Sequence, residues 1–156
     1  MKLRFLWIGE TRDANLLQLE EKYLERLQRF SSVERVSVPE LSKRDPRQTS
    51  AQMAREARLL QKKLGRCTCL ICLDESGRQL TSRDVAAFLE ERMNRGVSEI
   101  TFLVGGYLGT PQLIKERAHE NWALSRMTLP HELARIVLLE QVYRAACRVR
   151  GRPYHK

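Results

Sequence analysis

The stretch Ile100-Thr-Phe-Leu-Val-Gly-Gly-Tyr-Leu-Gly109, followed directly by Thr110-Pro111, decides the expected fold. It opens with a run of β-branched and apolar residues, which is typical of a strand buried on both faces of a sheet. The glycines then predict a turn, and we expect Thr110 to cap a helix that begins at Pro111. Backbone N–H groups converge at such strand ends in α/β sheets, so this loop is a candidate ligand site.

Two familiar phosphate-binding loops do not fit this stretch. A dinucleotide fingerprint ending at Gly109 requires glycine where the chain has Val104. A Walker loop requires a Lys-Ser or Lys-Thr pair, which the stretch lacks. An ordinary glycine-rich turn remains the alternative to a ligand site.

On both sides of this stretch, apolar spacing predicts alternating strands and helices. The expected strands cover residues 2–8, 33–38, 68–73, 100–104 and 122–127. The expected helices cover residues 15–29, 50–64, 111–120 and 132–149, together with one that Thr81 and Asp84 open as a capping box and Gly96 ends. Residues 74–77 should form a turn, and 41–49 an exposed basic loop. We therefore expect a single domain over residues 1–156, an α/β fold with a largely parallel sheet and helices on both faces.

The expected last helix, residues 132–149, is apolar over most of its circumference. One sheet covers only a stripe of a helix, so a second apolar surface must cover the remainder. A subunit partner is the simplest cover, and we expect a homodimer.

Composition favours a folded protein of the cytoplasm. The apolar fraction is 42% and the charged fraction 30%, which argues against disorder. No apolar run approaches the ~20 residues of a membrane span. The start has a basic tip like a signal peptide, but its apolar part is short and charged residues 10–13 follow, so a first strand is the better interpretation.

The net charge of +9, from 28 Lys plus Arg against 19 Asp plus Glu, indicates a polyanionic partner, with nucleic acid as the leading candidate. A basic protein without such a partner is the alternative, because the charge is spread along the chain. The candidate phosphate contacts are Lys43, Arg44, Arg47, Lys62, Lys63, Arg148, Arg150 and Arg152.

Three closely spaced cysteines, Cys67, Cys69 and Cys72, raise the possibility of a metal site. They lie in an extended apolar run whose alternation places Cys72 on the opposite face from the other two. Buried thiols that pack as small hydrophobic groups are the better interpretation, and we expect no metal.

Several short motifs occur in a fixed order along the chain. They are Leu73-Asp-x-x-Gly77, Leu103-Val-Gly-Gly-x-x-Gly109, Leu124-Ser-x-Met-Thr-Leu-Pro-His131, Tyr143-Arg144 and Pro153-Tyr-His155. As an ordered set they resemble the RlmH family of SPOUT methyltransferases, which methylate N3 of a pseudouridine in large-subunit ribosomal RNA. The resemblance covers the whole chain.

This resemblance implies a C-terminal deep trefoil knot, an obligate homodimer and S-adenosylmethionine held in the knot. Carried over by motif, the cofactor contacts are Leu73, Gly105, Leu124, Ser125, Arg126, Met127, Thr128 and Leu129. Apolar side chains would line the adenine site, and glycines at 105 and 106 would let the main chain approach the ligand. From composition alone, residues 124–129 read as an ordinary core strand.

The resemblance also implies catalytic roles near the C-terminus. Arg144 is the candidate cation for the N3 anion of the base, His155 for accepting the proton or holding the RNA, and Tyr154 for stacking on a base. The plain alternatives are an i,i+4 pair between Arg144 and Glu140 and a frayed terminus.

Two residues depart from the family pattern. Position 107 is Tyr where the family often has Pro or Ser, and position 152 is Arg where it often has His. Two other functions stay open: a SPOUT enzyme acting on another RNA such as tRNA, and a non-catalytic RNA-binding or ribosome-assembly module.

Overall fold

Strands and helices alternate along the chain, as the sequence predicts. The computed structural model describes residues 1–40 and 49–154. The strands are β1 Lys2–Ile8, β2 Ser32–Val38, β3 Leu70–Gln79, β4 Glu99–Val104 and β5 Glu120–Ala123. The helices are α1 Ala14–Gln28, α2 Thr49–Leu64, α3 Ser82–Asn94, α4 Gln112–Arg117 and α5 His131–Val149.

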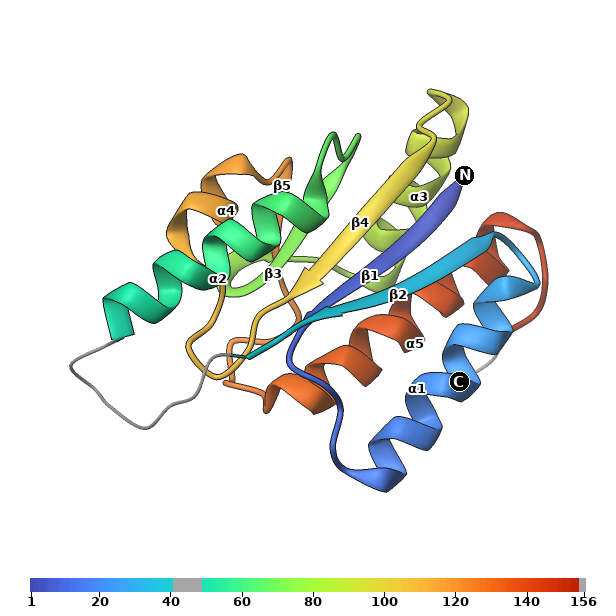
Figure 1. The fold of residues 1–156 in the computed structure, drawn as a ribbon. Helices are drawn as coiled ribbons and strands as arrows, with labels where there is room; N and C mark the ends of the chain where they lie inside the picture. Colours follow the sequence, from blue (N-terminus) through green and yellow to red (C-terminus); the bar gives the residue numbers. More distant parts are fainter. Residues whose placement is uncertain (41–48, 155–156) are drawn as a thin grey trace.

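The strands form one sheet in the order β2-β1-β4-β3-β5, with β4 in the centre (Figure 1). Every pair of neighbouring strands is parallel, so the prediction of a largely parallel sheet is confirmed. Phe5 of β1 lies opposite Phe102 of β4, and the two rings stack at 5.6 Å between centroids.

Two hydrophobic cores cover the two faces of the sheet. Helices α1, α3 and α5 pack on the face that Phe102 points into, and α2 and α4 pack on the face of Leu103 (Figure 1). Phe102 and Leu103 are both fully buried. The prediction that β4 is buried on both faces is therefore confirmed, because neighbouring side chains of a strand point to opposite faces.

Helix α5 is covered by more of its own chain than the sequence suggested. It packs between α1 and α3 as well as against the sheet (Figure 1), and Leu138, Leu139 and Val142 are almost completely buried there. The expected need for a subunit partner depends on α5 being covered by the sheet alone. Two helices of the same chain supply most of that cover.

The helix predicted over residues 111–120 is shorter, and the following strand begins earlier than predicted. Ala118 has extended backbone (φ −65°, ψ 145°), which ends α4 at Arg117. The His119 N–H donates to the Leu70 carbonyl at 2.8 Å, and the Leu70 N–H donates to His119 Nδ1 at 2.9 Å. This exchange sets the register of β5, so the strand predicted at 122–127 ends at Ala123.

The turn predicted at residues 74–77 is instead a bulge inside β3. Leu73 and Arg78 both lie opposite Trp122 of β5, and the strand continues to Gln79. At Gly77 an added Cβ would lie 2.6 Å from the backbone of Asn121, so only glycine allows the two strands to approach here. The bulge displaces residues 74–76 from the strand pairing.

The predicted capping box is confirmed, since Thr81 and Asp84 exchange side-chain and backbone hydrogen bonds at the start of α3.

The cysteines are free, and burial raises the pKa of the Cys72 thiol to about 12. In the described part of the chain, no cluster of His, Cys, Asp and Glu side chains is arranged to hold a metal ion. Over the same residues, no helix is long and apolar enough to span a bilayer.

Candidate functional site

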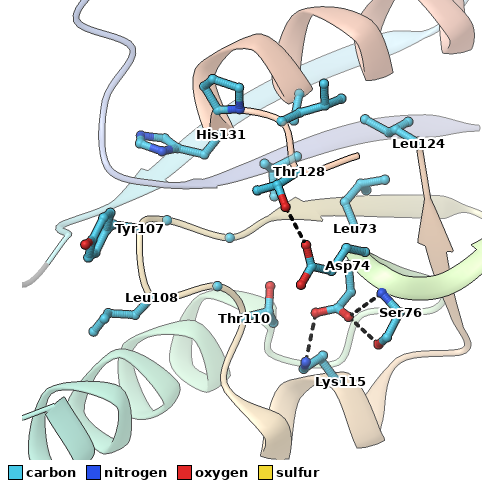
Figure 2. Close-up of a pocket in the computed structure, with 18 of the residues that line it drawn as sticks. Leu73, Asp74, Ser76, Tyr107, Leu108, Thr110, Lys115, Leu124, Thr128 and His131 are labelled. Atoms are coloured by element: carbon cyan, nitrogen blue, oxygen red, sulfur yellow. Dashed lines mark hydrogen bonds and ion pairs between the residues drawn. The ribbon is translucent and has the colours of Figure 1, made fainter. Parts of the chain in front are cut away.

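A cavity of about 970 Å³ opens where β4 ends and β3 bulges. This volume falls at the upper end of the roughly 300–1,000 Å³ typical of small-molecule sites. Three segments that are distant in sequence form most of the described lining: the bulge at 73–76, the glycine loop at 104–110, and residues 122–134 leading into α5 (Figure 2).

Most of the predicted cofactor contacts lie in this cavity. Its walls include Leu73, Gly105, Leu124, Ser125, Met127, Thr128 and Leu129. The exception is Arg126, which is exposed and whose Nε donates to Gln79 Oε1 at 3.2 Å. The family motifs therefore select residues that the fold brings together.

The glycine loop folds back on itself, and this explains its glycines. Gly109 N–H donates to the Gly106 carbonyl at 3.0 Å, and Gly109 has a positive φ of 75°. A Cβ on Gly105 would lie 2.7 Å from the Gly109 backbone. The sequence predicts that Gly105 and Gly106 allow close approach of a ligand; the structure adds that the loop itself requires glycine at position 105.

Glu40 holds the tip of this loop from the end of β2. Its carboxylate accepts the Tyr107 N–H at 2.8 Å. An added Cβ on Gly106 would lie 2.9 Å from the same carboxylate oxygen. The loop is therefore held by its own backbone hydrogen bond between Gly109 and Gly106 and, at its tip, by Glu40.

The predicted cap by Thr110 is wrong. Helix α4 begins at Gln112 after Pro111, and no side chain caps it. Thr110 is only 3% exposed, and its hydroxyl has no hydrogen-bond partner in the described structure. Such a buried, unpaired hydroxyl costs about 1–3 kcal/mol. Because Thr110 lines the cavity (Figure 2), a ligand bound there is an available partner for this hydroxyl.

Asp74 is fixed at the floor of the cavity by an ion pair and a tight turn. Lys115 Nζ lies 2.8 Å from Asp74 Oδ2, while Ser76 donates to Oδ1 from its backbone N–H at 3.0 Å and its hydroxyl at 2.5 Å (Figure 2). Burial by itself would raise the pKa of Asp74, but the bonds from Lys115 and Ser76 lower it below its ordinary value. Asp74 is therefore ionised at neutral pH.

The next residue, Glu75, connects two walls of the cavity. The Thr128 hydroxyl donates to Glu75 Oε2 at 3.1 Å (Figure 2). The bulge of β3 is thereby tied to the 124–129 segment. Sequence reasoning missed Glu75, Lys115 and the position of Thr110 on the wall; the only signal for Glu75 is its place inside the Leu73-Asp-x-x-Gly77 motif.

Arg144 and Tyr154 lie together, but away from this cavity. The cavity wall reaches along α5 only as far as Ala134, and Arg144 is ten residues further on, about 15 Å along a helix. Arg144 donates to Glu140 Oε1 from Nε at 3.0 Å and from an Nη at 2.6 Å. Tyr154 packs edge-on against Tyr143, with 4.8 Å between centroids. His155, the third predicted catalytic residue, lies outside the described residues.

Comparison with known proteins decides the family. A family model described as "Predicted SPOUT methyltransferase" matches residues 1–155. "Ribosomal RNA large subunit methyltransferase H" of Geotalea uraniireducens is 37% identical over 155 residues, covering 99% of both chains. The protein of that name from an Anaeromyxobacter species is 41% identical over 158 residues and covers both chains fully. The chain belongs to the RlmH family of SPOUT methyltransferases.

Solved structures support the fold alone. A probable methylase family protein from Haemophilus influenzae superposes with a TM-score of 0.61 at 11% identity, covering 99% of this chain and 70% of that one. A probable methyltransferase from Bordetella pertussis gives 0.60 at 13% identity, covering 92% and 95%. The RlmH chain therefore has the sheet arrangement of these methyltransferases.

The two departures from the RlmH pattern have clear positions. Tyr107 is 64% exposed at the tip of the glycine loop. The guanidinium carbon of Arg152 lies 5.3 Å from the centre of the Phe30 ring, which ties the C-terminal segment to the end of α1.

The predicted phosphate contacts of this RlmH member fall into two groups. Lys62 and Lys63 are exposed on α2, whereas Arg148, Arg150 and Arg152 are exposed at the end of α5. These helices lie on opposite faces of the sheet (Figure 1). A single chain therefore cannot present both groups to one flat RNA surface. The remaining candidates, Lys43, Arg44 and Arg47, lie outside the described residues.

Proposed function

We propose that this protein uses S-adenosylmethionine to methylate N3 of a pseudouridine in large-subunit ribosomal RNA. The observation that carries the proposal is the convergence of three distant segments, at 73, 105 and 124–129, on one cavity. These are the segments that the family motifs assign to the cofactor. Full-length relatives carry the name ribosomal RNA large subunit methyltransferase H, which supports the RNA class.

The cavity has the chemistry that this cofactor requires. Leu73, Leu124 and Leu129 provide apolar surface for the adenine, and the unpaired Thr110 hydroxyl provides a hydrogen-bonding group at the wall. The Asp74–Lys115 pair offers both charges to the amino-acid end of the ligand. When bound, the cofactor supplies a methyl group already activated as a sulfonium.

We propose that the working unit is a homodimer. Within one chain, Arg144 lies about 15 Å along α5 from Ala134, the last cavity residue, and Tyr154 packs beside Arg144, so neither reaches a base presented there. A second copy would bring its own Arg144 and Tyr154 to the opening. Large apolar side chains at the cavity and on the neighbouring helix α4 are exposed, with Tyr107 at 64%, Met127 at 75% and Leu113 at 53%, and they offer a contact surface.

We further propose that the C-terminal segment forms the deep trefoil knot of SPOUT proteins. The order β2-β1-β4-β3-β5 and the return of residues 122–134 beside the glycine loop are compatible with such a crossing. A knot would lock the 124–129 segment against the loop at 105–109. It would thereby hold the main chain of the cavity in a fixed shape.

The chemical task of the side chains is alignment and charge stabilisation. N3 of pseudouridine must lose a proton as its bond to the methyl carbon forms, and Arg144 would stabilise the resulting negative charge. The hydrogen bond from Arg144 to Glu140 raises the pKa of the guanidinium, so it stays charged. Tyr154 would stack on a base, a contact of about 1–3 kcal/mol. His155 would accept the proton or hold the RNA.

Basic residues on the two faces would hold the RNA backbone. Phosphate contacts set register and salt dependence without reading the base. In a dimer, Lys62 and Lys63 of one copy and Arg148, Arg150 and Arg152 of the other could face the same RNA. We place this activity in the cytoplasm, with ribosomes as the substrate.

Cofactor titration followed by labelled methyl transfer tests the proposal. The protein should bind S-adenosylmethionine and transfer the methyl group to ribosomes that lack the modification, and it should leave tRNA unlabelled. Binding with transfer only to tRNA would indicate a SPOUT enzyme of another specificity. Failure to bind the cofactor would leave the RNA-binding module as the function.

A further inference from the structure

The described lining of the cavity carries more acidic than basic side chains, although the protein is strongly basic. The chain has a net charge of +9, yet among the described residues the carboxylate, lysine and arginine side chains that line the cavity are Asp74, Glu75 and Lys115. Asp74 is neutralised by Lys115 at 2.8 Å. Glu75 has a different partner, the neutral hydroxyl of Thr128. The carboxylate of Glu75 therefore has no lysine or arginine partner among the described residues of the cavity wall.

The position of Glu75 follows from the bulge in β3. Residues 74–76 leave the strand pairing between Leu73 and Arg78, and Gly77 closes the bulge against β5. The Thr128 hydroxyl then donates to the Glu75 carboxylate and ties this exposed side chain to the 124–129 segment. Among the described residues, no lysine or arginine forms an ion pair with Glu75.

The charge of the ligand changes during the reaction that we have proposed. S-adenosylmethionine carries a sulfonium, an ammonium and a carboxylate, and so has a net charge of about +1 at neutral pH. Transfer breaks the bond from sulfur to the methyl carbon, forms the N3–methyl bond, and releases the N3 proton to a base. The product S-adenosylhomocysteine retains a neutral thioether and has no net charge. The same cavity must therefore admit a cation and release a neutral molecule.

We propose that Glu75 is a specificity-determining residue that makes the cavity prefer the cationic cofactor over its neutral product. This inference rests on the proposed function. A carboxylate without a cationic partner attracts the cationic cofactor. It does not attract the product in the same way, because the product has no net charge. Because Glu75 is exposed, the preference is screened by salt. The uncompensated charge thus favours cofactor loading and product release.

Calorimetric titrations of the wild-type protein and Glu75→Gln test this inference. The probes are S-adenosylmethionine, S-adenosylhomocysteine and sinefungin, an analogue in which a carbon bearing an ammonium group replaces the sulfonium. Glutamine retains an oxygen that accepts the Thr128 hydrogen bond, so the variant removes mainly the charge. The matched control is Glu90→Gln, at an exposed glutamate of α3 that does not line the cavity.

Glu75→Gln should weaken binding of S-adenosylmethionine and sinefungin about three- to tenfold and change S-adenosylhomocysteine by less than about twofold. The wild-type preference should shrink as salt rises, and Glu90→Gln should behave as wild type. Equal weakening of all three ligands would show that Glu75 only builds the wall, and an unchanged preference would remove its role; either result overturns the inference. Wild-type protein that binds none of the ligands would instead contradict the proposed function.

Discussion

The guanidinium carbon of Arg144 lies 4.8 Å from the centre of the Tyr154 ring. Arg144 is also bonded to Glu140 one turn earlier on α5, and Tyr154 rests on Tyr143. The tail is therefore docked as far as Tyr154 and not frayed. Burial and a hydrogen bond with Tyr23 raise the pKa of Tyr154 to about 12, so it remains a neutral phenol at working pH. The candidate cation and the candidate stacking ring are placed as one unit.

Arg144→Ala should abolish methyl transfer while leaving cofactor affinity within about twofold of wild type. Arg144 lies away from the cavity of its own chain, so its loss should not alter the walls that hold the cofactor. Charge stabilisation of this kind is worth about 10²–10³ in kcat. Single-turnover transfer and calorimetry measure the two quantities separately.

Arg144→Lys is the matched control for charge. Lysine keeps the cation but not the planar guanidinium, so partial recovery of turnover would support a role in stabilising the base anion. If Arg144→Ala lowers turnover and cofactor affinity to the same extent, the residue builds the cavity and the catalytic assignment fails.

Deletion of residues 153–156 should spare the oligomer yet reduce RNA methylation at least tenfold. The deletion removes Tyr154 and its ring contact of about 1–3 kcal/mol, together with His155. Helix α5, which packs between α1 and α3, stays intact. Light scattering and transfer assays on the same samples provide the measurements, and a dissociated oligomer would contradict the assignment of the tail to RNA.

Much of the fold follows from local pattern because the strands are buried on both faces. The run at 100–104 and the capping box of Thr81 and Asp84 are local signals, and the structure contains both. The boundary between α4 and β5 was wrong because the bonds between Leu70 and His119 set it, across 49 positions in sequence. The bulge before Gly77 likewise depends on a neighbouring strand.

Thr110→Val should stabilise the ligand-free protein and weaken cofactor binding. The Thr110 hydroxyl is buried without a partner, so its removal should raise the free energy of unfolding by about 1 kcal/mol. For a domain of this size that corresponds to a rise in Tm of roughly 2–4 °C. Loss of the hydrogen bond to the ligand should lower cofactor affinity about fivefold.

Thr101→Val is the matched control for this opposite pair of effects. The Thr101 hydroxyl is also buried, but it donates to Glu99 at 3.1 Å, so the same substitution should lower Tm and leave cofactor affinity unchanged. A lower Tm for Thr110→Val would show that its hydroxyl has a structural partner. Unchanged cofactor affinity would remove Thr110 from the binding site.

Gly105→Ala should lower cofactor affinity more than tenfold and destabilise the fold by about 1–3 kcal/mol. The new Cβ would lie 2.7 Å from the Gly109 backbone, which cannot move without opening the loop. Gly106→Ala should be milder, because it meets the flexible end of the Glu40 side chain and a methyl group of Ile8. Titration and thermal unfolding of both variants measure the difference. Equal effects would mean that loop closure does not shape the cavity.

The site was predictable only where family motifs marked it. No local sequence signal links Leu73, Gly105 and the 124–129 segment. Composition alone predicts a core strand at 124–129, yet the three meet in one cavity. Glu75 and Thr110 become candidates only in the folded structure, where the Glu75 carboxylate accepts from Thr128 and the buried Thr110 hydroxyl has no partner among the described residues. The separation of Arg144 from the cavity depends on how α5 packs, which no short motif encodes.

Nucleoside analysis of ribosomal RNA tests the central claim most directly. Ribosomes that lack the modification are incubated with this protein and S-adenosylmethionine labelled in the methyl group, and the RNA is digested and analysed by mass spectrometry. We expect the label in N3-methylpseudouridine, at one position of the large-subunit RNA, and we expect Arg144→Ala to remove it. Label in any other nucleoside, or no label in RNA that this protein binds with its cofactor, would contradict the proposed function.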